Sequence, residues 1–242
     1  MARPRVLVTG PVESLDEWCA AAQAAGWEAP GFALIEIEER LPAPDQARDL
    51  LAPPRPDRLC VTSVHALPFL GALAEREPAL RALECSVVGH KSVGRLRALG
   101  FSGTLEWHAS AETLRASLLA ADPRPGIVLW PRGDKSDELA RALRDAGIEV
   151  RDPVAYQNRP RAPGAPPPPA DVVFFASPSA VRAWSELGAD CGALRAMAIG
   201  ATTFQALLGE KRLAFRDIMA LSEPTSSSFA AALQHVDLRS TP

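Results

Sequence analysis

The chain has 242 residues, of which 23% are charged, and a formal net charge of −3. This length suffices for one large domain or two small ones, and the near-neutral charge gives no global basic field to hold nucleic acid or an anionic membrane. The N-terminal stretch MARPRVLVTG has only a short apolar run, and nowhere do about eighteen apolar residues follow one another. The sequence therefore predicts a cytoplasmic protein without a leader or a membrane span.

Three strand-turn-helix patterns each occur twice along the chain. In chain order, the segments are 5–29, 59–67, 86–100, 126–150, 173–181 and 197–211, and the first three match the last three as 5–29 with 126–150, 59–67 with 173–181, and 86–100 with 197–211. The offsets are nearly constant: 122 from Val6 to Val128, 114 from Ser63 to Ser177 and 111 from Gly89 to Gly200. The repeats predict two similar α/β halves.

The predicted strands are near-continuous apolar runs, which is typical of parallel sheets covered by helices on both faces. Strands that alternate with helices predict a doubly wound sheet, whose ligands bind at the carboxyl ends of the strands. Two Pro-rich segments, 36–57 and 151–171, interrupt this pattern and are predicted to be linkers.

The turns after the predicted strands share hydroxyl groups and glycines. These turns are Thr9-Gly10, Thr62-Ser63, Gly89 to Ser92, Arg132-Gly133, Ser177 to Ser179 and Gly200 to Thr203. A hydroxyl before a helix ordinarily caps it, whereas several amide and hydroxyl donors facing one cleft would bind a polyanion. Both interpretations stay open for any single turn.

Other signals are weak. Neither dinucleotide-binding nor phosphate-loop glycine motifs occur, G-x-S-x-G is absent, and the four cysteines and four histidines lack metal-ligand spacing. The only tyrosine, Tyr156, is either a packing residue at a junction or a proton donor in a cleft. Arg132, in WPRGD, is either a surface charge or a carboxylate clamp.

The ordered motifs resemble the uroporphyrinogen-III synthase family across nearly the whole chain. They are VLVTGP, VTSVHAL, VVGHKS, LWPRGDKSDELARALRDAGIEV, AYQNRP, VVFFASPSAV, AIGATTFQAL and SEPTSSSFAAAL. The resemblance implies two flavodoxin-like domains with doubly wound parallel sheets, joined by a two-stranded connector, with an active site in the cleft between them. It places residues 1–38 and 158–242 in domain 1, 52–150 in domain 2, and 39–51 and 151–157 in the connectors.

The resemblance also implies an enzyme, a lyase of haem biosynthesis that closes hydroxymethylbilane to uroporphyrinogen III with inversion of the D ring and loss of water. It implies no cofactor and no metal, a monomer, and transient contact with the preceding deaminase. Tyr156 matches the family's cleft tyrosine and is the candidate catalytic residue. The candidate substrate-binding residues are Thr9, Ser63, Ser92, Arg132, Ser177, Ser179, Thr202 and Thr203.

The chain departs from the family pattern at four positions. Gly10 stands where many relatives have Arg, His65 replaces a common Asn, Asn158 replaces a common Thr, and Ser92 falls where Thr is usual. These departures leave one alternative open, a two-domain tetrapyrrole-binding or regulatory protein with impaired catalysis. A two-lobed sugar or amino-acid binding protein is a second alternative, although its usual periplasmic form carries an export signal.

Overall fold

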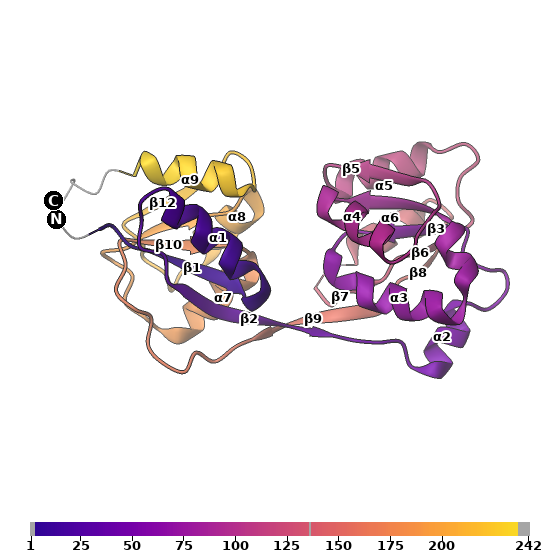
Figure 1. Cartoon of the computed structure of the whole chain (residues 1–242), viewed down its shortest axis with the longest axis horizontal. Helices are drawn as coiled ribbons and strands as arrows, with labels where there is room; N and C mark the ends of the chain where they lie inside the picture. The colour runs from indigo at the N-terminus through magenta and orange to yellow at the C-terminus, as the bar shows by residue number, and fades with distance from the viewer. Residues whose placement is uncertain (1–2, 136, 237–242) are drawn as a thin grey trace. The chain divides into compact units, whose positions relative to one another are not determined.

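The computed structural model describes residues 3–135 and 137–236. The chain divides into two units: unit 1 comprises Met1–Ile37 and Arg159–Pro242, and unit 2 comprises Glu38–Asn158 (Figure 1). The boundaries predicted from the sequence are residues 38 and 158.

Unit 1 is built on a parallel sheet with the strand order β12-β11-β10-β1-β2. Its strands are β1 (Val6–Pro11), β2 (Gly31–Glu39), β10 (Val172–Phe175), β11 (Arg195–Ala198) and β12 (Asp217–Ala220). Its helices are α1 (Val12–Ala24), α7 (Pro178–Leu187), α8 (Ala201–Gly209) and α9 (Ser226–Gln234).

Successive residues of a strand point to opposite faces of the sheet, so an apolar strand presents apolar side chains on both faces, and helices cover both. Val6 and Val8 of β1 pack in one core cluster with residues of α1 and α9, whereas Leu7 packs in another with residues of α7 and α8. All three side chains are fully buried. The apolar runs of the sequence are therefore strands covered on both faces.

Unit 2 repeats this arrangement with the strand order β5-β4-β3-β6-β8. Its sheet strands are β3 (Arg58–Val61), β4 (Glu84–Val88), β5 (Leu105–His108), β6 (Ile127–Leu129) and β8 (Glu149–Arg151). Its helices are α2 (Pro44–Leu50), α3 (Leu67–Arg76), α4 (His90–Ala98), α5 (Ala111–Ala120) and α6 (Glu138–Asp145), with 3₁₀ turns η1 (Val64–Ala66) and η2 (Pro78–Ala82).

The sheet of unit 2 also has a core on each face. Leu59 and Val61 pack with residues of α3 and α4, whereas Cys60 packs with residues of α5 and α6. The segment 39–51, which the sequence predicts as a connector, lies within unit 2. Helix α2 forms within this segment, beginning with a proline in its first turn, and its buried Ala47 joins the core of unit 2.

The two strand orders match when the repeated segments are aligned. Strand β10 corresponds to β3, β1 to β6, β11 to β4, β12 to β5 and β2 to β8, which confirms two similar doubly wound halves. In each unit the chain changes direction across the sheet between two neighbouring strands, β10 and β1 in unit 1 and β3 and β6 in unit 2. Ligands of doubly wound sheets bind at this switch point, beyond the carboxyl ends of the strands.

Two further strands complete the connection. Strand β9 (Val154–Pro160) lies beside β2, and β7 (Arg132–Gly133) pairs with β9 in parallel. The Arg40 amide donates to the Ala155 carbonyl at 2.8 Å, and the Arg161 amide donates to the Leu34 carbonyl at 2.9 Å. Residue numbers rise on one strand as they fall on the other, so β2 and β9 are antiparallel. They form the two-stranded connector.

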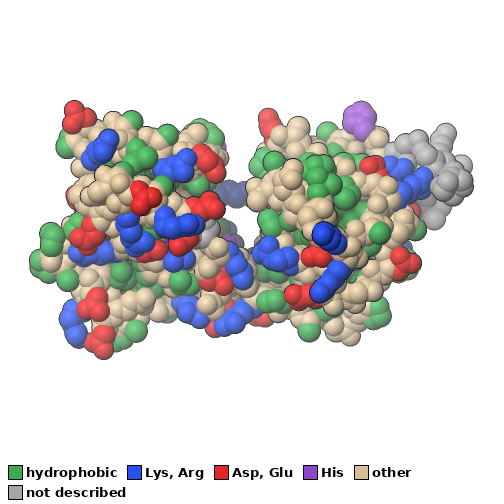
Figure 2. All heavy atoms as spheres, turned by 180° about the vertical axis from the view of Figure 1, so that it is seen from behind, with side chains coloured by type: hydrophobic (Ala, Val, Ile, Leu, Met, Phe, Trp, Pro, Cys, Tyr) green, Lys and Arg blue, Asp and Glu red, His purple; other side chains and the backbone are tan. Residues whose placement is uncertain are grey.

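The surface carries both signs of charge. Basic and acidic side chains are interspersed on the face that Figure 2 shows. Within the described residues, no helix is long and apolar enough to cross a membrane, and no group of three His, Cys, Asp or Glu side chains is placed to hold a metal ion.

Candidate active site

Tyr156 lies in a compact group of residues that belongs entirely to unit 2. Its phenol is half-buried and hydrogen-bonds the Ser63 side chain. Ser63 follows β3 and caps η1, where its Oγ accepts a hydrogen bond from the His65 amide at 3.3 Å. The His65 ring lies against the tyrosine, with ring centroids 5.6 Å apart. The structure therefore brings together two predicted site residues, Tyr156 and Ser63.

Gly133 packs closely against the Tyr156 ring. The two residues face each other across the β7–β9 pair, at a point where the register shifts between Arg132 and Gly133. A Cβ atom at Gly133 would lie 2.8 Å from both Cε2 and Cζ of Tyr156 and 3.0 Å from its hydroxyl oxygen. Since carbon atoms in contact ordinarily lie about 3.5–4.0 Å apart, a larger residue at this position would require the ring to move.

The environment holds the phenol in its protonated form. Burial raises the pKa of Tyr156 above its ordinary value, the Ser63 hydrogen bond opposes this rise, and the negative charge of Asp134 adds to it. At neutral pH the group is therefore a proton donor. A phenol with its proton retained and a hydroxyl partner beside it can act as a general acid.

Arg132 was predicted to bind the substrate, but its guanidinium is occupied. Its Nε donates to Asp152 Oδ2 at 2.8 Å, and its Nη1 donates to the Gly133 carbonyl at 3.0 Å. Asp152 also pairs with Arg144. The Arg132 and Asp152 side chains are 17% and 13% exposed, so most of this ion pair is shielded from water. In this structure the arginine therefore anchors its own strand, and its role as a carboxylate clamp stays a prediction.

Three of the predicted substrate-binding residues have buried side chains, and their contacts with substrate stay a prediction. Thr9 is fully buried in β1, and its Oγ1 donates to the Phe174 carbonyl at 2.8 Å, which ties β1 to β10. Ser92 and Thr203 lie in the first turns of α4 and α8 and are 3% and 2% exposed.

The other three predicted residues lie at the carboxyl edge of the sheet of unit 1. Ser177 caps α7, with its Oγ accepting from the Ala180 amide at 3.2 Å, and the Ser179 Oγ accepts from Arg182 at 3.2 Å. Thr202 is exposed in the first turn of α8, and Gly200, which precedes that helix, makes no side-chain cap. Free amide groups at a helix start favour an anionic partner.

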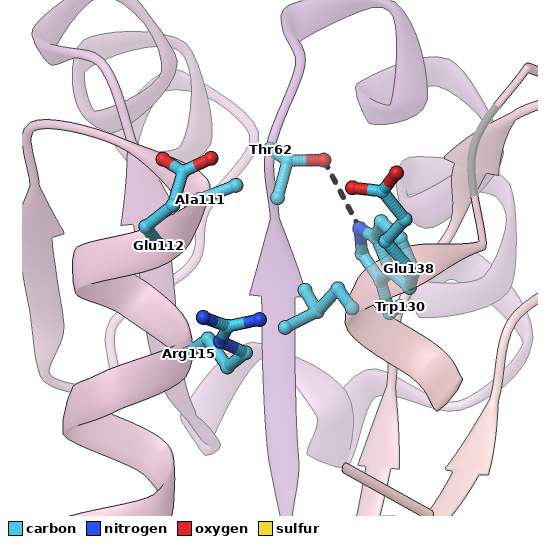
Figure 3. Close-up of a pocket in the computed structure, with 7 residues that line it drawn as sticks. Thr62, Ala111, Glu112, Arg115, Trp130 and Glu138 are labelled. Carbon is cyan, nitrogen blue, oxygen red and sulfur yellow. Dashed lines mark hydrogen bonds between the residues drawn. The ribbon is translucent and has the colours of Figure 1, made fainter. Parts of the chain in front are cut away.

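Unit 2 has a cavity of about 180 Å³ at its switch point, between the ends of β3 and β6 (Figure 3). The Trp130 indole N–H donates to the Thr62 hydroxyl at 3.0 Å across this opening. Figure 3 shows Glu112 and Arg115 entering from α5 and Glu138 from α6. The residues that line the cavity are Thr62, Ala111, Glu112, Arg115, Trp130, Glu138 and Leu139. A hydrogen bond from Ser110 holds the pKa of the Glu112 carboxyl below its ordinary value.

The two halves differ in the size of the side chains that pack near the switch point. In unit 1 three packed aromatic residues fill the matching region: Trp18, Phe174 and Phe229, with ring centroids 4.9 Å apart for Trp18 and Phe174 and 4.2 Å for Phe174 and Phe229. Unit 2 has a smaller residue at each matching position: Cys60 for Phe174, Leu114 for Phe229 and Leu139 for Trp18. The positions are matched by their distance along the chain from equivalent residues, namely the caps Ser63 and Ser177, the caps Ser110 and Thr225, and the glycines Gly147 and Gly26. Smaller side chains leave room between helices and sheet.

Asp134 and Asp152 carry no site signal in the sequence, and Gly133 stands out only as part of the turn after a predicted strand. The WPRGD motif was visible, but nothing in it shows that its glycine lies under Tyr156, more than twenty residues later. The β7–β9 pairing brings them together. The predicted cleft shared by both halves stays a prediction.

The fold defines a class of protein: a two-unit α/β protein with a duplicated, doubly wound parallel sheet and a partly buried phenol on a strand of the connector. Solved structures with this fold include uroporphyrinogen-III synthetase from Helicobacter pylori, which is 18% identical, with a TM-score of 0.64 over 96% of this chain and 99% of that chain. A mutant uroporphyrinogen III synthase from the extremely thermophilic bacterium Thermus thermophilus is also 18% identical, with a TM-score of 0.63 over 96% and 97%.

The match of a family model, described as uroporphyrinogen-III synthase HemD, extends over residues 16–231. No curated protein matches the chain. The chain belongs to the uroporphyrinogen-III synthase family, and its function is that of a lyase in porphyrin and haem biosynthesis. These comparisons give no support to the alternative of a tetrapyrrole-binding protein without catalysis.

Proposed function

We propose that Tyr156 is the general acid that removes the hydroxyl group of hydroxymethylbilane as water, so that the linear tetrapyrrole closes to uroporphyrinogen III. The observation that carries this proposal is the half-buried phenol, held between Gly133 and Ser63 with its pKa raised by burial. It is the only tyrosine of the chain. A group that keeps its proton at neutral pH suits the release of a poor leaving group.

In this proposal the carbon–oxygen bond of the hydroxymethyl group breaks as the Tyr156 proton passes to the departing oxygen. Water leaves, and electrons from the adjacent pyrrole nitrogen stabilise the methylene cation. The substituted α-carbon of the D ring attacks this cation and forms a spirocyclic intermediate. The older bond from that carbon to the methylene bridge of ring C then breaks, the released methylene cation bonds to the other α-carbon of the D ring, and the proton lost from that carbon returns to the phenolate. The Ser63 hydroxyl is suited to stabilise that phenolate, because its hydrogen bond favours the ionised form.

The binding groups of the proposal are hydroxyls and helix-start amides rather than fixed cations. Substrate carboxylates are bound at the turns of Ser177, Ser179 and Thr202, where helices α7 and α8 begin. Helix N-termini stabilise carboxylates through their free amides and through the helix dipole. Such contacts orient a flexible chain, and orientation decides which carbon of the D ring attacks.

The proposal further includes a monomer that works in the cytoplasm and receives its substrate by transient contact with the preceding deaminase. Cys19, Cys60, Cys85 and Cys191 are free thiols, as is usual for proteins of reducing compartments. Sedimentation or size-exclusion measurements with and without the deaminase test the oligomeric state and the contact.

The activity is tested by supplying freshly made hydroxymethylbilane to the purified chain and separating the porphyrin isomers after oxidation. The expected product is isomer III, formed faster than the spontaneous product. Formation of isomer I alone, at the rate measured without protein, would contradict the proposed function.

A further inference from the structure

We infer that Gly133 and Arg132 are positioning residues for Tyr156: Gly133 leaves the space that the ring occupies, and Arg132 anchors the strand that carries this glycine. The inference rests on the proposed role of Tyr156. It also reassigns Arg132 from a substrate ligand to a part of the support beneath the phenol.

The first element of the support is the close approach of Gly133. Its missing Cβ would stand 2.8 Å from Cε2 and Cζ of the ring and 3.0 Å from the hydroxyl oxygen. To restore an ordinary contact, the ring would have to move by roughly 0.7–1.2 Å. The backbone of β7 cannot easily move instead, because Arg132 donates its amide to the Pro153 carbonyl at 3.0 Å.

The second element is the anchor formed by Arg132. Its guanidinium joins Asp152, which precedes β9, to the Gly133 carbonyl on β7. Arg144 of α6 holds the other carboxylate oxygen of Asp152 and donates to the Val150 carbonyl at 2.8 Å. Since this network ties both strands of the β7–β9 pair to α6, it fixes the position of the Gly133 backbone relative to the Tyr156 ring.

Several polar or charged groups face the phenol from the elements around it. Ser63 and His65 lie on the segment after β3, and Asp134 follows β7. The Asp134 carboxylate is 3.5 Å from the Lys135 ammonium group, and the guanidinium of Arg132 is already paired with Asp152. A displaced ring changes its distances to all of these groups and its exposure to water together.

The test uses Gly133→Ala and the fact that Tyr156 is the only tyrosine. Ultraviolet titration of phenolate formation then reports on this one side chain without any need for substrate. In the wild type we expect titration above the ordinary value of about 10. In Gly133→Ala the displaced ring is more hydrated, so its pKa falls toward that value, and kcat falls by roughly 10- to 100-fold.

The matched control is Gly71→Ala, also in unit 2. A Cβ there meets only the Leu99 side chain at 3.9 Å, an ordinary contact, so neither the titration nor kcat should change. Arg132→Lys is the second variant, because it keeps the charge but loses the fork that joins Asp152 to Gly133. It should shift the titration in the same direction as Gly133→Ala and lower kcat more than it raises KM.

The outcomes separate this inference from the proposed function. An unchanged tyrosine titration in both Gly133→Ala and Arg132→Lys overturns the positioning roles, whatever the activity. A raised KM with an unchanged titration in Arg132→Lys shows that the arginine binds substrate directly and overturns its reassignment. If the wild type forms only isomer I, the proposed function fails, while the titrations still decide how the ring is held.

Discussion

Replacing Tyr156 by Phe removes one oxygen atom and leaves the ring in place. The ring contacts with Gly133 and His65 persist, since neither depends on the hydroxyl group. The lost interaction is the hydrogen bond to Ser63. Ser63 keeps its role as the cap of η1 because its Oγ still accepts from the His65 amide. The substitution therefore tests the proton of the phenol rather than the fold.

The expected loss of turnover is large in comparison with the expected loss of stability. General acid catalysis ordinarily contributes about 10²- to 10⁴-fold, which corresponds to about 2.7–5.4 kcal/mol of activation free energy. One hydrogen bond contributes only about 1 kcal/mol to the free energy of unfolding, and removing a buried hydroxyl also removes its desolvation cost. KM should change little because the proposed carboxylate contacts lie elsewhere.

The assay is single-turnover formation of isomer III from fresh hydroxymethylbilane, with urea unfolding of both proteins as the control for folding. Wild-type turnover should persist at alkaline pH until the phenol ionises above its ordinary value of about 10. A Tyr156→Phe protein with wild-type stability and wild-type turnover would falsify the assignment of the general acid.

Two further predictions concern buried groups. Thr9→Val removes the bond to the Phe174 carbonyl, so it should lower the free energy of unfolding by about 1 kcal/mol and leave KM unchanged; a raised KM in a protein of unaltered stability would restore Thr9 as a ligand. Burial raises the pKa of Cys85 from 9.0 to about 12, so the unfolded thiol ionises first as pH rises. The contribution of the buried, protonated thiol to the free energy of unfolding is therefore fully present below pH 9. It is lost between about pH 9 and 12, at up to about 1.4 kcal/mol per pH unit. Cys85→Ala should make the alkaline decline in urea stability shallower, and an equal slope in both proteins would contradict this linkage.

The fold was predictable because its signals are local and occur twice. Apolar runs followed by amphipathic helices specify parallel strands with covered faces, and the nearly constant offsets specify the duplication. Helix α2 was missed because the Pro-rich composition around it masks a short helix whose stability comes from burying Ala47 in unit 2. Short helices depend on packing, which local composition does not contain.

Among the candidate site residues, the sequence determined their chemical type and their place at the ends of strands, but not the direction of their side chains. Side chains at adjacent positions point to different faces of a strand or helix, so Thr203 is buried whereas its neighbour Thr202 is exposed. Thr9 is likewise buried on its strand. Family resemblance singled out Tyr156, and the sequence alone determined the duplicated sheet around it. Only the tertiary structure placed Gly133 under that ring and Arg132 in its ion pair, because β7 and β9 meet through pairing between segments that are distant along the chain.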